Sequence, residues 1–95
     1  MDFKTEILRI INEYLKELHP KIFLFGSRAA AKNSEVSDID IGIDCNRKLT
    51  SIELSDIKEK FENSNIVFKI DIVDFNNVSE KFKQIIFENG VVEWQ

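Results

Sequence analysis

The sequence predicts an α/β (α+β) domain whose elements follow the order αβαβαβα. Amphipathic segments with helical spacing alternate with short runs of strand-forming residues. A length of 95 residues suits one domain with a modest core. The hydrophobic fraction of 43% and the charged fraction of 32% are typical of a soluble globular chain and not of a disordered one. We therefore expect residues 1–95 to form a single domain.

The first two predicted elements are a helix and a buried strand. Residues 3–18 carry apolar side chains at helical spacing, with charged residues between them. His19 and Pro20 should end this helix, because the residue before a proline is pushed out of the helical region. With no second histidine as a co-ligand, His19 is interpreted as part of this stop. Residues 21–25, KIFLF, then predict an interior strand that is covered on both faces.

The segment after Gly26 is predicted to lead through a short helix into an alternating strand. Residues 28–33, RAAAKN, favour one or two helical turns, and residues 34–37 are expected to form a polar loop. On the next strand, residues 38–44, the isoleucines point to one face. The opposite face should carry Asp38, Asp40, Gly42 and Asp44.

The second half of the chain is predicted to contain two helices around a third strand. Residues 50–53, TSIE, form a capping-box pattern that opens a helix running to about residue 63. Residues 66–75, IVFKIDIVDF, are rich in β-branched and aromatic residues and predict a strand. Residues 77–80 start the last helix, whose apolar face should contain Phe82, Ile85 and Ile86.

The end of the chain is predicted to leave that helix at a glycine. Gly90 is placed as the C-terminal cap, because glycine adopts the left-handed conformation that such caps require. The following residues 91–94, VVEW, are expected to add either a short strand or a docking tail.

Asp38 and Asp40 form a candidate metal-binding pair. Side chains at i and i+2 of a strand share a face, with Cα atoms roughly 6–7 Å apart. Their repulsion of roughly 1–3 kcal/mol is tolerable on a wet surface, so the pair alone does not establish a site. It becomes useful when both carboxylates bind divalent cations, since two metals ~3.5–4 Å apart can clamp a phosphoryl transfer. Mg²⁺ is the expected ion, because it prefers oxygen ligands and shares them with phosphates.

A third carboxylate is expected from the strand at residues 66–75. Strand alternation places Lys69, Asp71 and Val73 on its mixed face, and the apolar face should point into the core. Asp71 is therefore the preferred third ligand. Asp74, at the strand edge, remains the alternative.

Gly26 and Ser27 are candidate phosphate-binding residues. A glycine at the end of a buried strand permits a sharp turn and a close approach of a phosphate. Free N–H groups of a helix that starts just afterwards would face the anion, and the Ser27 hydroxyl can add a hydrogen bond. Arg28 either contacts a phosphate as well or lies exposed on the short helix.

Charge and composition argue against several classes of protein. The net charge is −4 and the chain has no basic stripe, which argues against binding DNA on its own. No apolar run approaches the ~20 residues that a bilayer-spanning helix needs, and the N-terminus lacks a signal-peptide pattern. The single Cys45 cannot form an internal disulfide, so a cytoplasmic location is expected and the residue is interpreted as incidental.

These motifs together resemble the minimal nucleotidyltransferases, small members of the DNA polymerase beta superfamily. Gly26–Ser27, ten intervening residues and Asp38–Ile39–Asp40 are similar to the family signature. IDIVDF resembles the strand with the family's third carboxylate, at Asp71, and FENGVVEW resembles the terminal segment. Residues 29–31 are alanines where relatives commonly have a second glycine, so we expect the loop into the second strand to differ in shape.

The resemblance implies a nucleotidyltransferase fold, with a small mixed sheet and helices packed against it. Gly26 and Ser27 would bind the phosphates of ATP, while Asp38, Asp40 and Asp71 would hold Mg²⁺, as two ions. The reaction would transfer AMP to an acceptor hydroxyl and release pyrophosphate, and Asp71 would help to deprotonate that hydroxyl. Many such proteins are antitoxins of HEPN-domain toxins, and in characterised systems the acceptor is a tyrosine of the toxin.

Two alternatives remain open on the sequence. The protein could neutralise a HEPN toxin by forming a complex without catalysis, although all three carboxylates are present. It could also transfer nucleotides to a small molecule or RNA, which the absence of a basic surface and of an acceptor domain makes less favoured. Replacing Asp38 and Asp40 by asparagine separates catalysis from simple blocking.

Overall fold

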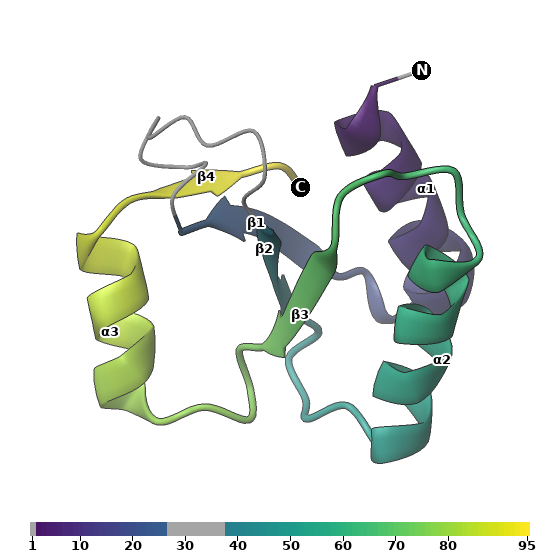
Figure 1. The fold of residues 1–95 in the computed structure, drawn as a ribbon. Coiled ribbons are helices and arrows are strands. Elements are labelled where there is room, and N and C mark those ends of the chain that lie inside the picture. The colour runs from purple at the N-terminus through teal and green to yellow at the C-terminus, as the bar shows by residue number, and fades with distance from the viewer. Residues whose placement is uncertain (1, 27–37) are drawn as a thin grey trace.

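The computed structural model describes residues 2–26 and 38–95, and these form a four-stranded mixed sheet with three α-helices (Figure 1). The strand order is β3-β2-β1-β4; β1 pairs antiparallel with β2 and β4, and β2 pairs parallel with β3. The elements are α1 (Phe3–Leu15), a 3-10 turn (Lys16–Leu18), β1 (Lys21–Phe25), β2 (Ile39–Asp44), α2 (Ser51–Glu62), β3 (Ile70–Asp74), α3 (Glu80–Glu88) and β4 (Val91–Glu93). The predicted α/β class and mixed sheet are confirmed.

The sheet has one face covered by α1 and α2, which lie together on the same side of it (Figure 1). Their apolar side chains form the larger core with alternate residues of β1 and β2. Ile39, Ile41 and Ile43 of β2 are each 0% exposed in this core. The predicted alternation of β2 is therefore confirmed, because every second side chain enters the core.

In the described part of the chain, the other face of the sheet is covered by α3 and has a smaller, aromatic core (Figure 1). Phe23 and Phe75 stack with ring centroids 5.4 Å apart, and Ile86 of α3 packs against them. Gly42 makes this packing possible, because a Cβ at that position would lie 2.1 Å from Cζ of Phe75. The aromatic side chain therefore rests directly on the backbone of β2.

The helix boundaries largely follow their sequence signals. The α-helical part of the first helix ends at Leu15, and residues 16–18 continue as a 3-10 turn before His19 adopts φ 48°. The predicted capping box is confirmed: the Thr50 side chain accepts from the N–H of Glu53, and the Glu53 side chain accepts from the N–H of Thr50. Gly90 follows α3 with φ 106°, as expected for its C-terminal cap.

Two predicted elements differ from the structure in extent or burial. The strand expected over residues 66–75 begins only at Ile70, because β2 begins at Ile39, the residue with which Ile70 pairs. In α3 only Ile86 is buried, whereas Phe82 and Ile85 are 46% and 45% exposed. The predicted apolar face of this helix is thus only partly covered.

Two further predictions concern the C-terminal residues and the segment after Gly26. Residues 91–94 were predicted as a strand or a tail, and the structure shows that residues 91–93 form a short strand, β4, beside β1. The helix predicted over residues 28–33 lies outside the described residues. Within the described part of the chain, no helix has the length and apolar character needed to cross a membrane.

Candidate functional site

The carboxylates of β2 and β3 meet on the sheet face opposite the isoleucine core. Asp40 and Asp71 are direct partners in the parallel register, so their backbones are about 4.8 Å apart across the strand pair. Asp38 lies exposed just before β2. The structure therefore brings two of the three predicted carboxylates to neighbouring positions, with the third next to them along the chain.

Asp40 is the electrostatic centre of this group. Burial raises its pKa, and the negative charges of Asp71 and Asp38 raise it further. Each cause disfavours the ionised carboxylate. A cation placed between these groups would offset both the lost hydration and the mutual repulsion, so the arrangement favours a positively charged ligand.

Gly26 forms the wall of the site beside Asp40. Its φ of +79° lies in the left-handed region, and a Cβ built on it would be 2.3 Å from Oδ2 of Asp40. A side chain at this position would therefore push the carboxylate away, in addition to straining the turn. The sharp turn predicted here is confirmed, whereas Ser27 and Arg28 lie outside the described residues.

Asp74 has a structural role that distinguishes it from Asp71. It is 5% exposed, and its carboxylate accepts hydrogen bonds from the backbone N–H of Leu49 at 2.7 Å and of Asn76 at 2.9 Å. These bonds fasten the segments that precede α2 and follow β3. The side chain of Asp71 is 42% exposed on the other face. The geometry thus favours Asp71 as the third carboxylate of the site.

The donor chemistry of the site fits Mg²⁺, although its side chains do not form a closed triad. Among residues 2–26 and 38–95, no three His, Cys, Asp or Glu side chains lie close enough together to hold a metal ion. Carboxylate oxygens are the ligands that Mg²⁺ prefers, and it completes its shell with water and substrate phosphates. Two adjacent carboxylates, Asp40 and Asp71, with the exposed Asp38 beside them, are consistent with such a partial shell.

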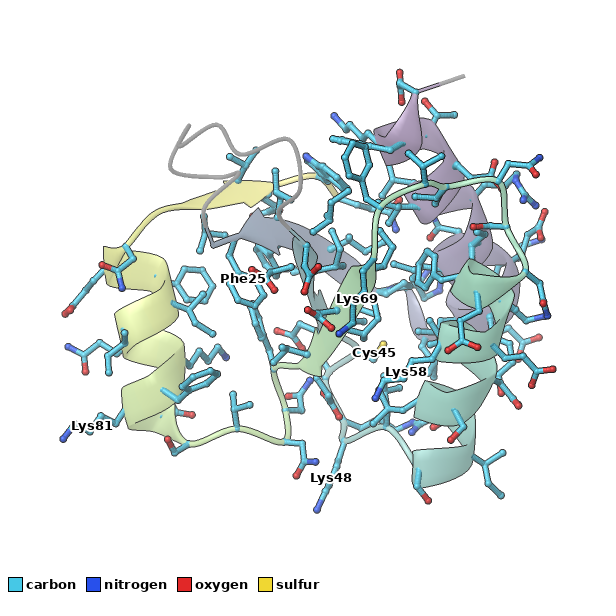
Figure 2. All side chains as sticks on the ribbon, in the orientation of Figure 1. Phe25, Cys45, Lys48, Lys58, Lys69 and Lys81 are labelled. Carbon is cyan, nitrogen blue, oxygen red and sulfur yellow. The ribbon has the colours of Figure 1, made fainter. Side chains whose placement is uncertain are left out.

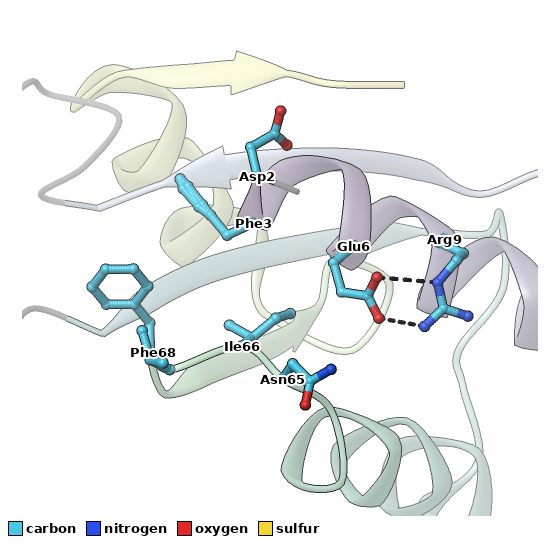
Figure 3. Close-up of a pocket in the computed structure, with 8 residues that line it drawn as sticks. Asp2, Phe3, Glu6, Arg9, Asn65, Ile66 and Phe68 are labelled. Carbon is cyan, nitrogen blue, oxygen red and sulfur yellow. Dashed lines mark hydrogen bonds and ion pairs between the residues drawn. The ribbon is translucent and has the colours of Figure 1, made fainter.

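Two other features of the molecule do not contribute to this site. A hollow of about 750 Å³ lies between the start of α1 and residues 65–68 (Figure 3), but Arg9 within it is paired with Glu6 and Glu13. Cys45 is buried, and burial raises the pKa of its thiol to about 11. Cys45 is therefore a protonated thiol near neutral pH, and only the thiolate is a good nucleophile. This agrees with its interpretation as an incidental residue.

Two residues near the site were not assigned a role from the sequence. Gly42 interrupts an otherwise alternating strand, which is a known sign of a close backbone approach; the structure shows that the approaching group is Phe75. Lys69 was placed on the mixed face of its strand without a function. Its Nζ lies 3.9 Å from Oδ1 of Asp71.

A small mixed sheet with adjacent aspartates and a glycine turn against one of them defines a nucleotidyltransferase-type domain. The family model described as "Polymerase beta, Nucleotidyltransferase" matches residues 6–93. The chain belongs to this family and is a nucleotidyltransferase, as the resemblance to its minimal members predicted.

Relatives and solved structures agree with this assignment. The chain is 33% identical over 94 residues to a probable protein adenylyltransferase, MntA of Haemophilus influenzae, covering 97% of this chain and 82% of that protein. It shares its fold with a toxin–antitoxin MntA–HpeT mutant, with a TM-score of 0.77, 21% identity, and coverage of 95% of this chain and 70% of that one. A toxin–antitoxin structure with AMP-PNP has a TM-score of 0.68 and 25% identity, covering 90% and 69%.

Proposed function

We propose that this protein is the cytoplasmic antitoxin of a toxin–antitoxin pair and transfers AMP from ATP to a tyrosine hydroxyl of a HEPN-domain toxin. The similarity to MntA supports adenylyl transfer to a protein. The toxin–antitoxin neighbours support a toxin as the partner, and the neighbour with AMP-PNP supports an adenine nucleotide as donor. The tyrosine and the HEPN class come from the family resemblance of the Gly26–Ser27 and Asp38–Asp40 motifs.

The observation that carries this proposal is the pairing of Asp40 with Asp71 beside Gly26. In the proposed site, Asp38, Asp40 and Asp71 would hold two Mg²⁺ ions. Gly26, Ser27 and Arg28 bind the phosphates of ATP. Bound Mg²⁺ would supply positive charge that stabilises the phosphoryl oxygens in the transition state.

The reaction exchanges one phosphorus–oxygen bond for another. The acceptor oxygen attacks the α-phosphorus of ATP while the bond from that phosphorus to the α–β bridging oxygen breaks, so pyrophosphate leaves. Asp71 receives the proton of the acceptor hydroxyl, since a carboxylate at the site can act as a general base. The product is an AMP group joined to the acceptor through a phosphodiester.

The acceptor tyrosine has to come from another molecule. The chain has one tyrosine, Tyr14. Its hydroxyl donates a 2.6 Å hydrogen bond to Asp56 of α2, and its ring packs against the larger core. That core lies on the opposite face of the sheet from Asp40, so Tyr14 cannot reach the carboxylates of its own chain.

An intact-mass experiment tests the proposal directly. A HEPN-domain toxin, as the proposed partner, is incubated with this protein, ATP and Mg²⁺, and the Asp38→Asn/Asp40→Asn variant serves as the control. We expect mass increments of whole adenylyl groups on the HEPN protein, located on tyrosine by peptide mapping and absent with the variant. A stable complex formed by both versions without any increment would instead support the binding-only antitoxin. Increments on RNA or a small molecule alone would contradict the protein acceptor.

A further inference from the structure

Lys69 is the basic residue closest to the candidate carboxylates in the described structure. Its Nζ lies 3.9 Å from Oδ1 of Asp71, and among residues 2–26 and 38–95 no other lysine or arginine forms an ion pair with Asp38, Asp40 or Asp71. The carbonyl of Lys69 accepts a 2.9 Å hydrogen bond from the N–H of Ile39. This bond fixes the backbone of the lysine beside the start of β2, close to Asp38.

The ammonium group of Lys69 can move away from Asp71, because its side chain is exposed and flexible. The side chain of Lys69 is 72% exposed, and it stands at the β3 end of the sheet (Figure 2). A hollow of about 550 Å³ beside β3 includes Lys58, Lys69 and Asp71 in its lining. The long stem of a lysine is flexible and its charge is a single hydrated point. Movement of Nζ away from Asp71 therefore requires no change in the backbone.

A singly charged ammonium and a divalent ion would compete for the same carboxylate. Without a metal, the ammonium partly neutralises a group of three aspartates that otherwise repel one another. When a divalent ion is ligated by Asp71, the ammonium and the metal repel at short range. The lysine should therefore weaken metal binding to the free protein while stabilising the metal-free site.

We propose that Lys69 is a built-in counter-cation of the carboxylate site, which neutralises Asp71 in the metal-free protein and is displaced when a divalent ion binds. This inference rests on the proposed metal role of Asp38, Asp40 and Asp71. In this role, Lys69 lowers the affinity of the nucleotide-free protein for a divalent ion.

Titration with Mn²⁺ tests this role without any measurement of catalysis. Free Mn²⁺ is counted by electron paramagnetic resonance at low ionic strength, with no nucleotide present. We expect Lys69→Met to bind Mn²⁺ about three- to tenfold more tightly than the wild type, because a positive charge near the ion has been removed. Lys69→Arg should bind like the wild type. Lys58→Met is the matched control, because Lys58 lines the same hollow and should leave the affinity unchanged.

The outcomes distinguish this inference from the proposed function. If the wild type binds Mn²⁺, Asp38→Asn/Asp40→Asn does not, and Lys69→Met binds with unchanged or lower affinity, the counter-cation role is wrong while the metal site stands. If the wild type shows no binding that depends on Asp38 and Asp40, the metal site itself fails, and the role of Lys69 with it. Equal gains from Lys69→Met and Lys58→Met would also overturn the inference, because general charge would then explain them.

Discussion

The two faces of β2 differ in what covers them, although they belong to the same six residues. On one face Ile39, Ile41 and Ile43 are 0% exposed under α1 and α2. The other face carries Asp40 and Gly42, and there α3 contributes to a smaller aromatic core. One strand thus supplies the main core with one set of side chains and the candidate site with the other, so substitutions of neighbouring residues should have separable effects.

The face that carries the site is itself divided into two parts. Towards one end, the ring of Phe75 rests on Gly42 and contacts Phe23 and Phe25. Two residues earlier in β2, Asp40 lies beside Gly26 and Asp71. The aromatic core does not include these two aspartates, so their carboxylates remain accessible to a ligand.

The largest effect on stability is expected from Ile41→Ala, on the face of β2 that α1 and α2 cover. The side chain is 0% exposed, and its truncation leaves a cavity that should lower the free energy of unfolding by about 2–5 kcal/mol. Urea denaturation followed by circular dichroism measures the change. Ile52→Ala is the control, because Ile52 is 71% exposed and should cost below about 0.5 kcal/mol. Equal losses for the two variants would contradict the difference in covering.

Gly42→Ala should show how closely the aromatic core around Phe75 is packed against β2. The added Cβ would lie 2.1 Å from Phe75 Cζ, and overpacking of this kind costs about 1–3 kcal/mol. The same substitution in a Phe75→Leu background should cost less, since the side chain that it displaces is smaller. A double-mutant cycle of urea unfolding measures this coupling. Additive losses would mean that the cost of Gly42→Ala does not come from its contact with Phe75.

Gly26→Ala separates backbone strain from the geometry of the site. A residue with Cβ in the left-handed region costs about 1–2 kcal/mol, and at Gly26 this Cβ also displaces the carboxylate of Asp40. Gly90→Ala is a matched control: Gly90 has φ +106°, but a Cβ there meets nothing within 4 Å. We expect similar stability losses from both variants, measured by thermal unfolding, but a loss of adenylyl transfer above about tenfold only from Gly26→Ala. A comparable loss of transfer in both would contradict this role.

The smallest effect is expected from Asp40→Asn, as a change in the pH dependence of stability. The pKa of Asp40 is raised by burial and then by Asp71 and Asp38. The wild type should therefore lose stability as the pH rises from below 3.8 through the raised pKa of the folded state. Asparagine stays neutral, so the variant should lack this loss and be more stable at pH 7, by roughly 0.5–1 kcal/mol after screening. Chemical denaturation in EDTA at several pH values measures it, with Glu59→Gln as the control, because Glu59 is exposed on α2.

Local signals in the sequence were sufficient for much of the fold. The capping box at Thr50, the cap at Gly90 and the alternation of β2 are confirmed, because each depends on residues within one turn of helix or a few residues of strand. The turn at Gly26 is confirmed for the same reason. Strand alternation alone also placed Asp71 on the sheet face opposite the isoleucine core.

Long-range pairing decided what these local signals left open. The start of β3 at Ile70 depends on where β2 begins, and the burial of only Ile86 in α3 depends on how that helix meets the sheet. Asp71 and Asp74 have similar local sequences. They differ because the backbone of Leu49, far away in the chain, donates a hydrogen bond to Asp74.

The sequence by itself determined the fold class, the family and which aspartates share a strand face, because periodicity and short motifs are properties of neighbouring residues. Only the tertiary structure decided that Asp40 faces Asp71, that Gly26 makes room for the Asp40 carboxylate, and that Gly42 makes room for Phe75. Those relations depend on register and on contacts between strands. They exist only when segments distant in the chain are brought to within a few ångströms of one another.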